Sequence, residues 1–231
     1  MSSPRTAIAA KFSPFYLGAF AWNLAQGTTN VLLPLYALEL GYSGVGIGAL
    51  LALPVVLQFA FNLAGGAYVD RIGARNMLHA ACIAMVFAAV TFQLATSYAV
   101  MMSGVSLFVL SRGTFWPANY AMGSQLPGDR AQNMGWLNAV TNAGQIAGTA
   151  VGGMLIVAVG FKAAFWLTAC MSLGGILLTA MLPHVPRRAA RAPRGILVTY
   201  AGLARQKPMY FGIACAFLSV LPFTKIGRAH V

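Results

Sequence analysis

Six long apolar stretches, separated by short polar connections, dominate the hydrophobic pattern of this 231-residue chain, and part of a seventh follows. They cover residues 14–38, 45–68, 77–97, 100–123, 135–159, 163–182 and about 208–223. Each of the first six is long enough to cross the hydrocarbon core of a bilayer, which takes about 20 residues. No alternation with a period of two runs through them, and a helix satisfies its own backbone hydrogen bonds in lipid. The pattern therefore predicts six membrane-spanning α-helices and the start of another.

Amide side chains interrupt three of these stretches at helical spacing. The first stretch carries Asn23, Gln26 and Asn30, and the second carries Gln58 and Asn62. The fifth carries a longer series, which is Asn138, Asn142, Gln145 and Thr149. Spacings of three and four put each series on one face of its helix, and amides in lipid need partners, so these faces should point into the bundle. Two interpretations are open: the stripes line a polar cavity, which we favour, or they provide interhelical hydrogen bonds that hold the bundle together.

Arg112 stands near the centre of the fourth stretch, where an arginine costs about 2.5–3.5 kcal/mol to insert. Trp116 and Asn119 follow it four and seven residues later, on the same face of the helix. A charged residue at this depth normally faces a water-filled cavity or a partner. Its guanidinium either binds an anionic group of a substrate or bonds to backbone carbonyl groups and neighbouring polar side chains. The residue types alone leave both roles open.

The composition agrees with a lipid environment, because 59% of the residues are hydrophobic, 8% are charged and the mean hydropathy is +0.74. A soluble domain carries about 25% charged residues. The net charge of +12 comes from basic residues placed almost entirely on one side of the predicted spans, which indicates membrane topology rather than nucleic-acid binding. Of the basic residues in the connections, Lys162 lies on one side of the predicted spans and eleven lie on the other. The eleven are Arg5, Lys11, Arg71, Arg75, Arg130, Arg187, Arg188, Arg191, Arg194, Arg205 and Lys207. This asymmetry predicts a cytoplasmic N-terminus and a cytoplasmic 183–207 segment.

A short charged hinge with the pattern G-x-x-x-D-R-x-G-x-R joins the second and third predicted spans. Its defining residues are Gly66, Asp70, Arg71, Gly73 and Arg75. In this context the pattern resembles the signature loop between the second and third helices of the major facilitator superfamily of secondary transporters. The family's second basic residue at the end of the loop is replaced here by Asn76.

A second charged connection follows the fourth span. The sequence Pro127-Gly128-Asp129-Arg130 resembles the P-x-E-R loop of the same family, with Asp in place of Glu. The resemblance implies that Asp129 and Arg130 join the hinge charges in a cytoplasmic latch, which holds helix ends together in one state and releases them in another. Exposed ion pairs are worth only about 0–1 kcal/mol, which suits a latch that must open. Ordinary surface charge is the alternative interpretation.

The resemblance also implies a fold in which the first, fourth and fifth helices line a central cavity and two three-helix repeats build each half. The candidate substrate-contacting residues are Asn23, Gln26, Asn30, Arg112, Trp116, Asn119, Asn138, Asn142 and Gln145. The family often has an arginine in its fourth helix, followed four residues later by a glycine. In this chain only the arginine matches that pattern, as Arg112. Gly113 is directly adjacent to it, and Trp116 takes the later place.

Glycines mark one face of the fifth span. Gly144, Gly148 and Gly152 recur at every fourth position, a spacing that lets another helix backbone approach closely. The segment resembles the G-x-x-x-G-P-x-x-G-G pattern of antiporters in the family, with Thr149 in place of the proline. The replacement removes the kinking residue and weakens an antiport assignment, whereas the close-packing interpretation stands.

Other kinds of chemistry find little support. The acidic residues number three, and they are Glu39, Asp70 and Asp129. None lies at mid-membrane, so we expect any proton carrier in the remainder of the protein. Cys82, Cys170 and Cys215 all fall in apolar segments, and we expect them to be free, buried packing residues. Without a Ser-His-Asp set, a metal-spaced His/Cys cluster or a phosphate-binding loop, we expect neither an enzyme nor a bound metal or cofactor.

Together these features predict an all-α integral membrane protein: the six-helix N-terminal bundle of a major-facilitator-type transporter, with the start of a seventh helix. We expect a transmembrane domain at 1–182, a basic cytoplasmic linker at 183–207 and the truncated start of a second half at 208–231. The expected function is secondary active transport of a small organic solute across the inner (plasma) membrane by alternating access. Expected partners are the solute, the lipid bilayer and the missing C-terminal half, with no nucleic acid. The alternative is a non-transporting membrane sensor or scaffold that keeps the fold.

Overall fold

Each of the first six predicted spans forms a helix, and the polar connections between these helices are short. The computed structural model describes residues 4–182. These residues form six helices and no strand: α1 (Pro4–Glu39), α2 (Gly44–Ile72), α3 (Ala74–Gln93), α4 (Tyr98–Gly123), α5 (Arg130–Val159) and α6 (Phe161–Ala180). The predicted linker at 183–207 and the predicted seventh span at 208–223 lie outside the described residues.

The helix boundaries follow from local side-chain chemistry. Ser43 Oγ accepts a hydrogen bond from the Gly46 amide at 3.2 Å, so the hydroxyl caps the start of α2. Asp129 caps α5 in the same way, since its Oδ1 accepts from the Ala131 amide at 2.9 Å. Gly73 alone separates α2 from α3, with φ of +93°, a backbone conformation that residues with a Cβ rarely adopt.

Five of these helices contain a segment long and apolar enough to cross a membrane, among the described residues. The first predicted span, 14–38, is not among them, although α1 has 36 residues. Its amide and hydroxyl side chains lower its apolar character, and several of them are buried by other helices: Asn23, Gln26, Thr28 and Thr29. A helix enclosed by protein can carry polar groups that a lipid-facing helix cannot.

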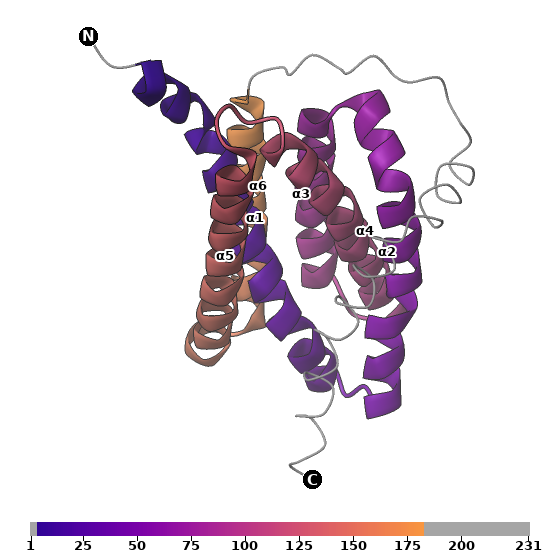
Figure 1. Ribbon diagram of the computed structural model, residues 1–231. Helices are drawn as coiled ribbons and strands as arrows, with labels where there is room; N and C mark the ends of the chain where they lie inside the picture. Colours follow the sequence, from indigo (N-terminus) through magenta and orange to yellow (C-terminus); the bar gives the residue numbers. More distant parts are fainter. Residues whose placement is uncertain (1–3, 183–231) are drawn as a thin grey trace, which may run out of the picture. The chain divides into compact units, whose positions relative to one another are not determined.

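The six helices pack as two interleaved sets of three. Helix α1 packs mainly against α5 and α6, and α4 packs mainly against α2 and α3 (Figure 1). The contact between α3 and α6 joins the two sets. Exchanging α1 with α4, α2 with α5 and α3 with α6 leaves this pairing pattern unchanged, as two three-helix repeats require. Helices α1 and α4 therefore occupy equivalent central positions.

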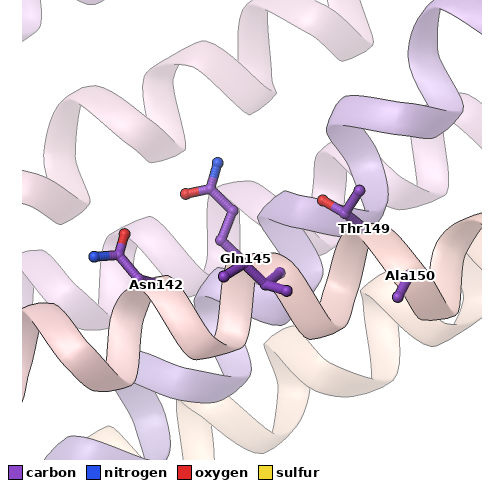
Figure 2. A pocket seen from close by; sticks show the side chains of 5 residues that line it. Asn142, Gln145, Thr149 and Ala150 are labelled. Atoms are coloured by element: carbon purple, nitrogen blue, oxygen red, sulfur yellow. The ribbon is translucent and has the colours of Figure 1, made fainter. Parts of the chain in front are cut away.

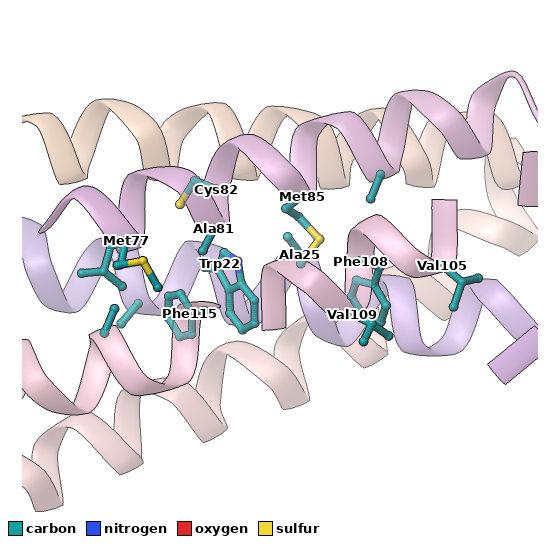
Figure 3. Close-up of a cluster of buried hydrophobic side chains, with 14 of the residues drawn as sticks. Trp22, Ala25, Met77, Ala81, Cys82, Met85, Val105, Phe108, Val109 and Phe115 are labelled. Atoms are coloured by element: carbon teal, nitrogen blue, oxygen red, sulfur yellow. The ribbon is translucent and has the colours of Figure 1, made fainter. Parts of the chain in front are cut away.

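The apolar core lies where α1, α3 and α4 meet. The Trp22 indole stacks on the Phe115 ring, with centroids 3.7 Å apart and planes 5° from parallel (Figure 3). Cys82 of α3 is buried in this cluster, as predicted, whereas Cys170 of α6 is exposed. The prediction of burial was wrong for Cys170 because an apolar helix has one face toward the bundle and another away from it. Cys215 lies outside the described part of the chain.

Glycines let α1 and α5 approach at backbone distance. A Cβ placed on Gly144 would lie 2.6 Å from the Phe20 carbonyl oxygen, and one on Gly148 would overlap the Leu24 carbonyl oxygen. On the opposite helix, a Cβ on Gly27 would overlap the Gln145 carbonyl oxygen. The close packing predicted from the glycine spacing is therefore present, with α1 as the partner of α5.

Candidate functional site

Arg112 projects from α4 with its charge only partly satisfied by protein. The side chain is half-buried, and its guanidinium carbon lies 5.7 Å from the centroid of the Phe108 ring, within reach of a cation–π interaction. Its Nε is buried without an acceptor among the described residues. Such an arrangement leaves a charged donor available to a further ligand or partner.

Aromatic rings lie next to Arg112 on its cytoplasmic side, toward the end of α4 that is predicted to face the cytoplasm. The Trp116 ring stacks near the Tyr120 ring, with centroids 5.6 Å apart, and meets the Trp22 ring edge-on at 6.2 Å. Trp116 is half-buried and Tyr120 is exposed. Trp116 was predicted from the sequence, whereas Trp22, Phe108 and Tyr120 were not, because aromatic residues in an apolar helix give no sequence signal that separates a site from a core.

The polar face of α1 points between α4 and α5. Trp22 contacts α4 and Gly27 contacts α5, and at about 100° per residue Asn23 and Gln26 fall between those two directions. Asn23 is 0% exposed and donates from Nδ2 to the Ala19 carbonyl at 2.8 Å, while its Oδ1 has no partner among the described residues. Gln26 is 3% exposed, and its Oε1 is likewise unpaired within that part. Asn30, one turn further on, is half-buried.

Contacts between the helices show which residues of different helices lie at the same level, that is, at the same position along the axis of the bundle. On α4, Gly123 lies beside Phe15 and Phe115 beside Trp22, so α4 runs antiparallel to α1. Counting along both helices from these contacts brings Arg112 level with Gln26. By the same count the predicted residue Asn119 lies near the level of Ala19, and it is 0% exposed, with neither amide atom paired among the described residues.

An open hollow of about 490 Å³ lies along α5. Its lining combines Asn142, Gln145 and Thr149 with two apolar side chains, Ile146 and Ala150. Figure 2 shows the two amides and the hydroxyl projecting from the same side of the helix. Asn138, the remaining member of this stripe, is exposed.

The same register connects the hollow to the other helices. Gly148 abuts Leu24 and Gly152 abuts Thr28, so α5 runs parallel to α1 and Thr149 comes close to the level of Gln26. The predicted residues therefore separate into two groups. Asn23, Gln26 and Asn119 are buried between helices, whereas Asn138 and Asn142 are exposed and Gln145 is half-buried. Substrate contact by either group stays a prediction.

The hinge residues lie where α2 passes into α3. Gly66 and Asp70 belong to α2, and Asp70 and Arg71 are exposed. Arg75 reaches across to the end of α6, where its Nε donates to the Thr179 carbonyl at 3.2 Å and its Nη2 to the Ala180 carbonyl at 2.7 Å. A basic side chain on the last carbonyl groups of a helix also opposes the negative end of the helix dipole.

The second charged connection makes its described side-chain hydrogen bonds with the start of α5. The Asp129 carboxylate caps α5, and the Arg130 side chain is exposed. A common charge cluster of the two connections therefore stays a prediction. Thr179 was not predicted from the sequence, and its Oγ1 lies 2.8 Å from His79 Nδ1 beside the Arg75 contact. An isolated threonine near the end of an apolar helix gives no signal of such a role.

Metal-binding geometry does not occur in the part of the chain that the structure describes. No group of three His, Cys, Asp or Glu side chains lies close enough there to hold an ion. The chemistry available to the described polar faces is hydrogen bonding, charge pairing through Arg112 and aromatic contact.

Comparisons with known proteins identify a family and similar proteins for this chain. A family model described as the Major Facilitator Superfamily matches residues 15–224. The chain is also similar to the quinolone resistance protein NorA of Staphylococcus aureus strain COL, with 24% identity over 179 residues, which are 75% of this chain and 45% of that protein. The same protein of strain MW2 shows the same identity and coverage. The chain thus spans about half the length of the curated relatives it matches.

Proposed function

The chain belongs to the major facilitator superfamily, and from that premise we propose that it forms one wall of the solute site in a secondary transporter working by alternating access. It is a multi-pass membrane protein, and its family points to transport rather than enzymatic catalysis. The cargo is a small organic solute. The remainder of the protein, its C-terminal half, supplies the opposite wall of the site.

The observation that carries this proposal is the convergence of unpaired polar atoms from α1 and α4. Asn23 Oδ1, Gln26 Oε1, Arg112 Nε and both amide atoms of Asn119 are buried without a partner among the described residues. Buried polar groups in proteins are nearly always hydrogen-bonded, so a set of exceptions on two facing helices indicates a place where a ligand binds. The hollow on α5, with its amides and hydroxyl, continues the same polar surface.

The two charged connections support a latch at the cytoplasmic end. Asp70, Arg71 and Arg130 are exposed, so they are free to exchange partners as the two halves of the transporter rock against each other. If the N-terminus is cytoplasmic, as the basic residues predict, both charged connections lie on the cytoplasmic side of the plasma membrane. The basic segment at 183–207 joins the two halves on that side.

A flux measurement tests the proposed function. The protein made from its full gene and placed in liposomes should move at least one radiolabelled organic solute with a rate that saturates. Residues 1–231 alone should give no saturable flux, because the exposed α5 stripe then has no facing wall. Saturable flux from residues 1–231 would contradict the two-wall proposal, and a full-length protein that binds solute without moving it would support the sensor alternative.

Accessibility of Arg112 gives a second test of the same site. In a variant whose native cysteines are replaced by serine, Arg112→Cys should react with a membrane-impermeant thiol reagent in at least one conformation. Solute should slow that reaction. Leu107→Cys, half-buried on the same helix but on another face, serves as the control. A cysteine at 112 that stays inert in inward-facing and outward-facing states would contradict cavity exposure.

A further inference from the structure

We propose, on the basis of the transport function proposed above, that the solute class is an organic anion with an aromatic ring, held by Arg112 and the rings beside it. The first support is the charge balance. The chain has three acidic residues, and within the described helices each lies at an end: Glu39 closes α1, Asp70 is in the last turn of α2 and Asp129 caps α5. None of them lies near the middle of α4, where Arg112 stands.

The second support is the isolation of the Arg112 charge. In the candidate spans that the structure describes, the other basic residues lie in the first turn of their helices: Arg75, Arg130 and Lys162. Arg112 Nε is buried without an acceptor among the described residues. The guanidinium makes a cation–π contact with the Phe108 ring. A guanidinium presents donors in a planar fork that matches carboxylate or sulfonate oxygens. A cation at this level would meet like charge on the wall of the site that the described helices form.

The third support is the ring system one turn away. Trp116 follows Arg112 by four residues, and its half-buried ring makes contacts with Trp22, Phe115 and Tyr120. These contacts fix the orientation of the indole while part of it stays accessible. A ligand whose anionic group reaches Arg112 can therefore lay an aromatic ring against Trp116.

Hydrogen-bonding groups at the same level complete the site. Gln26 of α1 is level with Arg112, and its Oε1, which has no partner among the described residues, can accept from a ligand hydroxyl or amine. Neutral amides and hydroxyls on α5 tolerate either sign of charge. Among the described residues at this level, Arg112 is the one that carries a charge, so this wall of the site favours an anionic solute.

The experiment uses three probes with one ring system and different charge: 2-naphthoate, 2-naphthalenemethanol and 2-naphthylmethylammonium. Equilibrium dialysis measures their binding to the full-length protein in lipid nanodiscs, with empty nanodiscs subtracted. The anion should bind at least about tenfold more tightly than the cation, a difference typical of one charge-assisted contact. Equal affinities, or tighter binding of the cation, would overturn the proposal without any variant being needed.

Variants assign the effect to its residues. Arg112→Gln should weaken 2-naphthoate by about tenfold and change the neutral probe by less than twofold, while Arg112→Lys falls between because it keeps the charge and loses the fork. Lys162→Gln, which removes an exposed positive charge elsewhere, should leave all three affinities unchanged. Trp116→Leu should weaken all three probes, and Trp166→Leu, an exposed tryptophan of α6, should weaken none. An equal loss for all three probes in Arg112→Gln would overturn the charge assignment.

The outcomes separate this inference from the transport function. Selective anion binding by a protein that gives no flux would support the site and contradict transport. Saturable flux of a cationic solute, with no competition from 2-naphthoate, would support transport and overturn the anion class.

Discussion

At the scale of single residues, one hydroxyl group links three helices. Ser111 of α4 accepts a hydrogen bond from Trp22 Nε1 of α1 at 3.1 Å and donates to the Ala81 carbonyl of α3 at 2.7 Å. Ser111 is fully buried, so both contacts lie away from solvent. The hydroxyl thereby fixes the indole that stacks on Phe115 and meets Trp116.

Ser111→Ala should lower the free energy of unfolding by about 1–3 kcal/mol, because it leaves the buried Trp22 Nε1–H without an acceptor. The measurement is the thermal unfolding midpoint of the full-length protein in detergent. Ser106→Ala is the matched control, since the Ser106 hydroxyl donates only to the Met102 carbonyl of its own helix. Equal midpoints for the two variants would show that the three-helix link contributes nothing measurable.

At the scale of helices, the approach of α5 to α1 depends on glycines, three of them on α5. Gly144, Gly148 and Gly152 all face α1, and Thr28 Oγ1 adds a hydrogen bond to the Gly148 carbonyl at 2.9 Å. Lipid offers no hydrophobic driving force for such pairing, so backbone packing of this kind carries much of the association energy. The two cavity walls α1 and α5 should therefore move together.

Gly148→Ala should lower the free energy of unfolding by about 1–3 kcal/mol, since the new methyl group would overlap the Leu24 carbonyl and force the helices apart. Gly153→Ala provides the control, because a Cβ there meets no atom within 4 Å. In a helix interior that change gains about 0.5–1 kcal/mol of intrinsic helix stability. Thermal unfolding checks both, and a Gly148→Ala protein as stable as Gly153→Ala would contradict the packing.

The hinge between α2 and α3 gives a prediction about movement. Asp70→Asn should lower the transport rate of the full-length protein by up to about fivefold while leaving its amount in the membrane unchanged. The reason is that an exposed pair worth up to about 1 kcal/mol shifts a conformational equilibrium by about that factor. Glu39→Gln neutralises an exposed acid at the C-terminal end of α1. This control variant should transport at the normal rate. Normal flux through Asp70→Asn would exclude a role for this carboxylate in a latch.

At the scale of the whole molecule, the distribution of basic residues predicts the orientation in the membrane. In a cysteine-free background, Thr96→Cys, exposed between α3 and α4, should react with an impermeant thiol reagent added to intact cells. Gln125→Cys, exposed after α4, should react only in inside-out vesicles. The reverse pattern would place the N-terminus outside and remove the cytoplasmic latch.

The helices were predictable from sequence because lipid imposes a length and an apolar composition on every span. The predicted stretch 100–123 corresponds to α4 at Tyr98–Gly123, and 163–182 to α6 at Phe161–Ala180. The hinge at Gly73 was predictable too, since few residues other than glycine adopt its backbone conformation. Family membership follows from the same local signals, which need no knowledge of neighbouring helices.

The sequence by itself thus determined the all-helical membrane architecture, the family and the helices that carry the polar faces. Only the tertiary structure decided what each polar residue contacts. Asn23 and Asn138 are the same residue type in similar apolar helices, yet Asn23 is buried and Asn138 is exposed. The level of Arg112 beside Gln26 likewise depends on the antiparallel register of α4 against α1. The physical reason is that spacing within one helix defines a face, whereas burial and pairing depend on side chains from helices distant in the sequence.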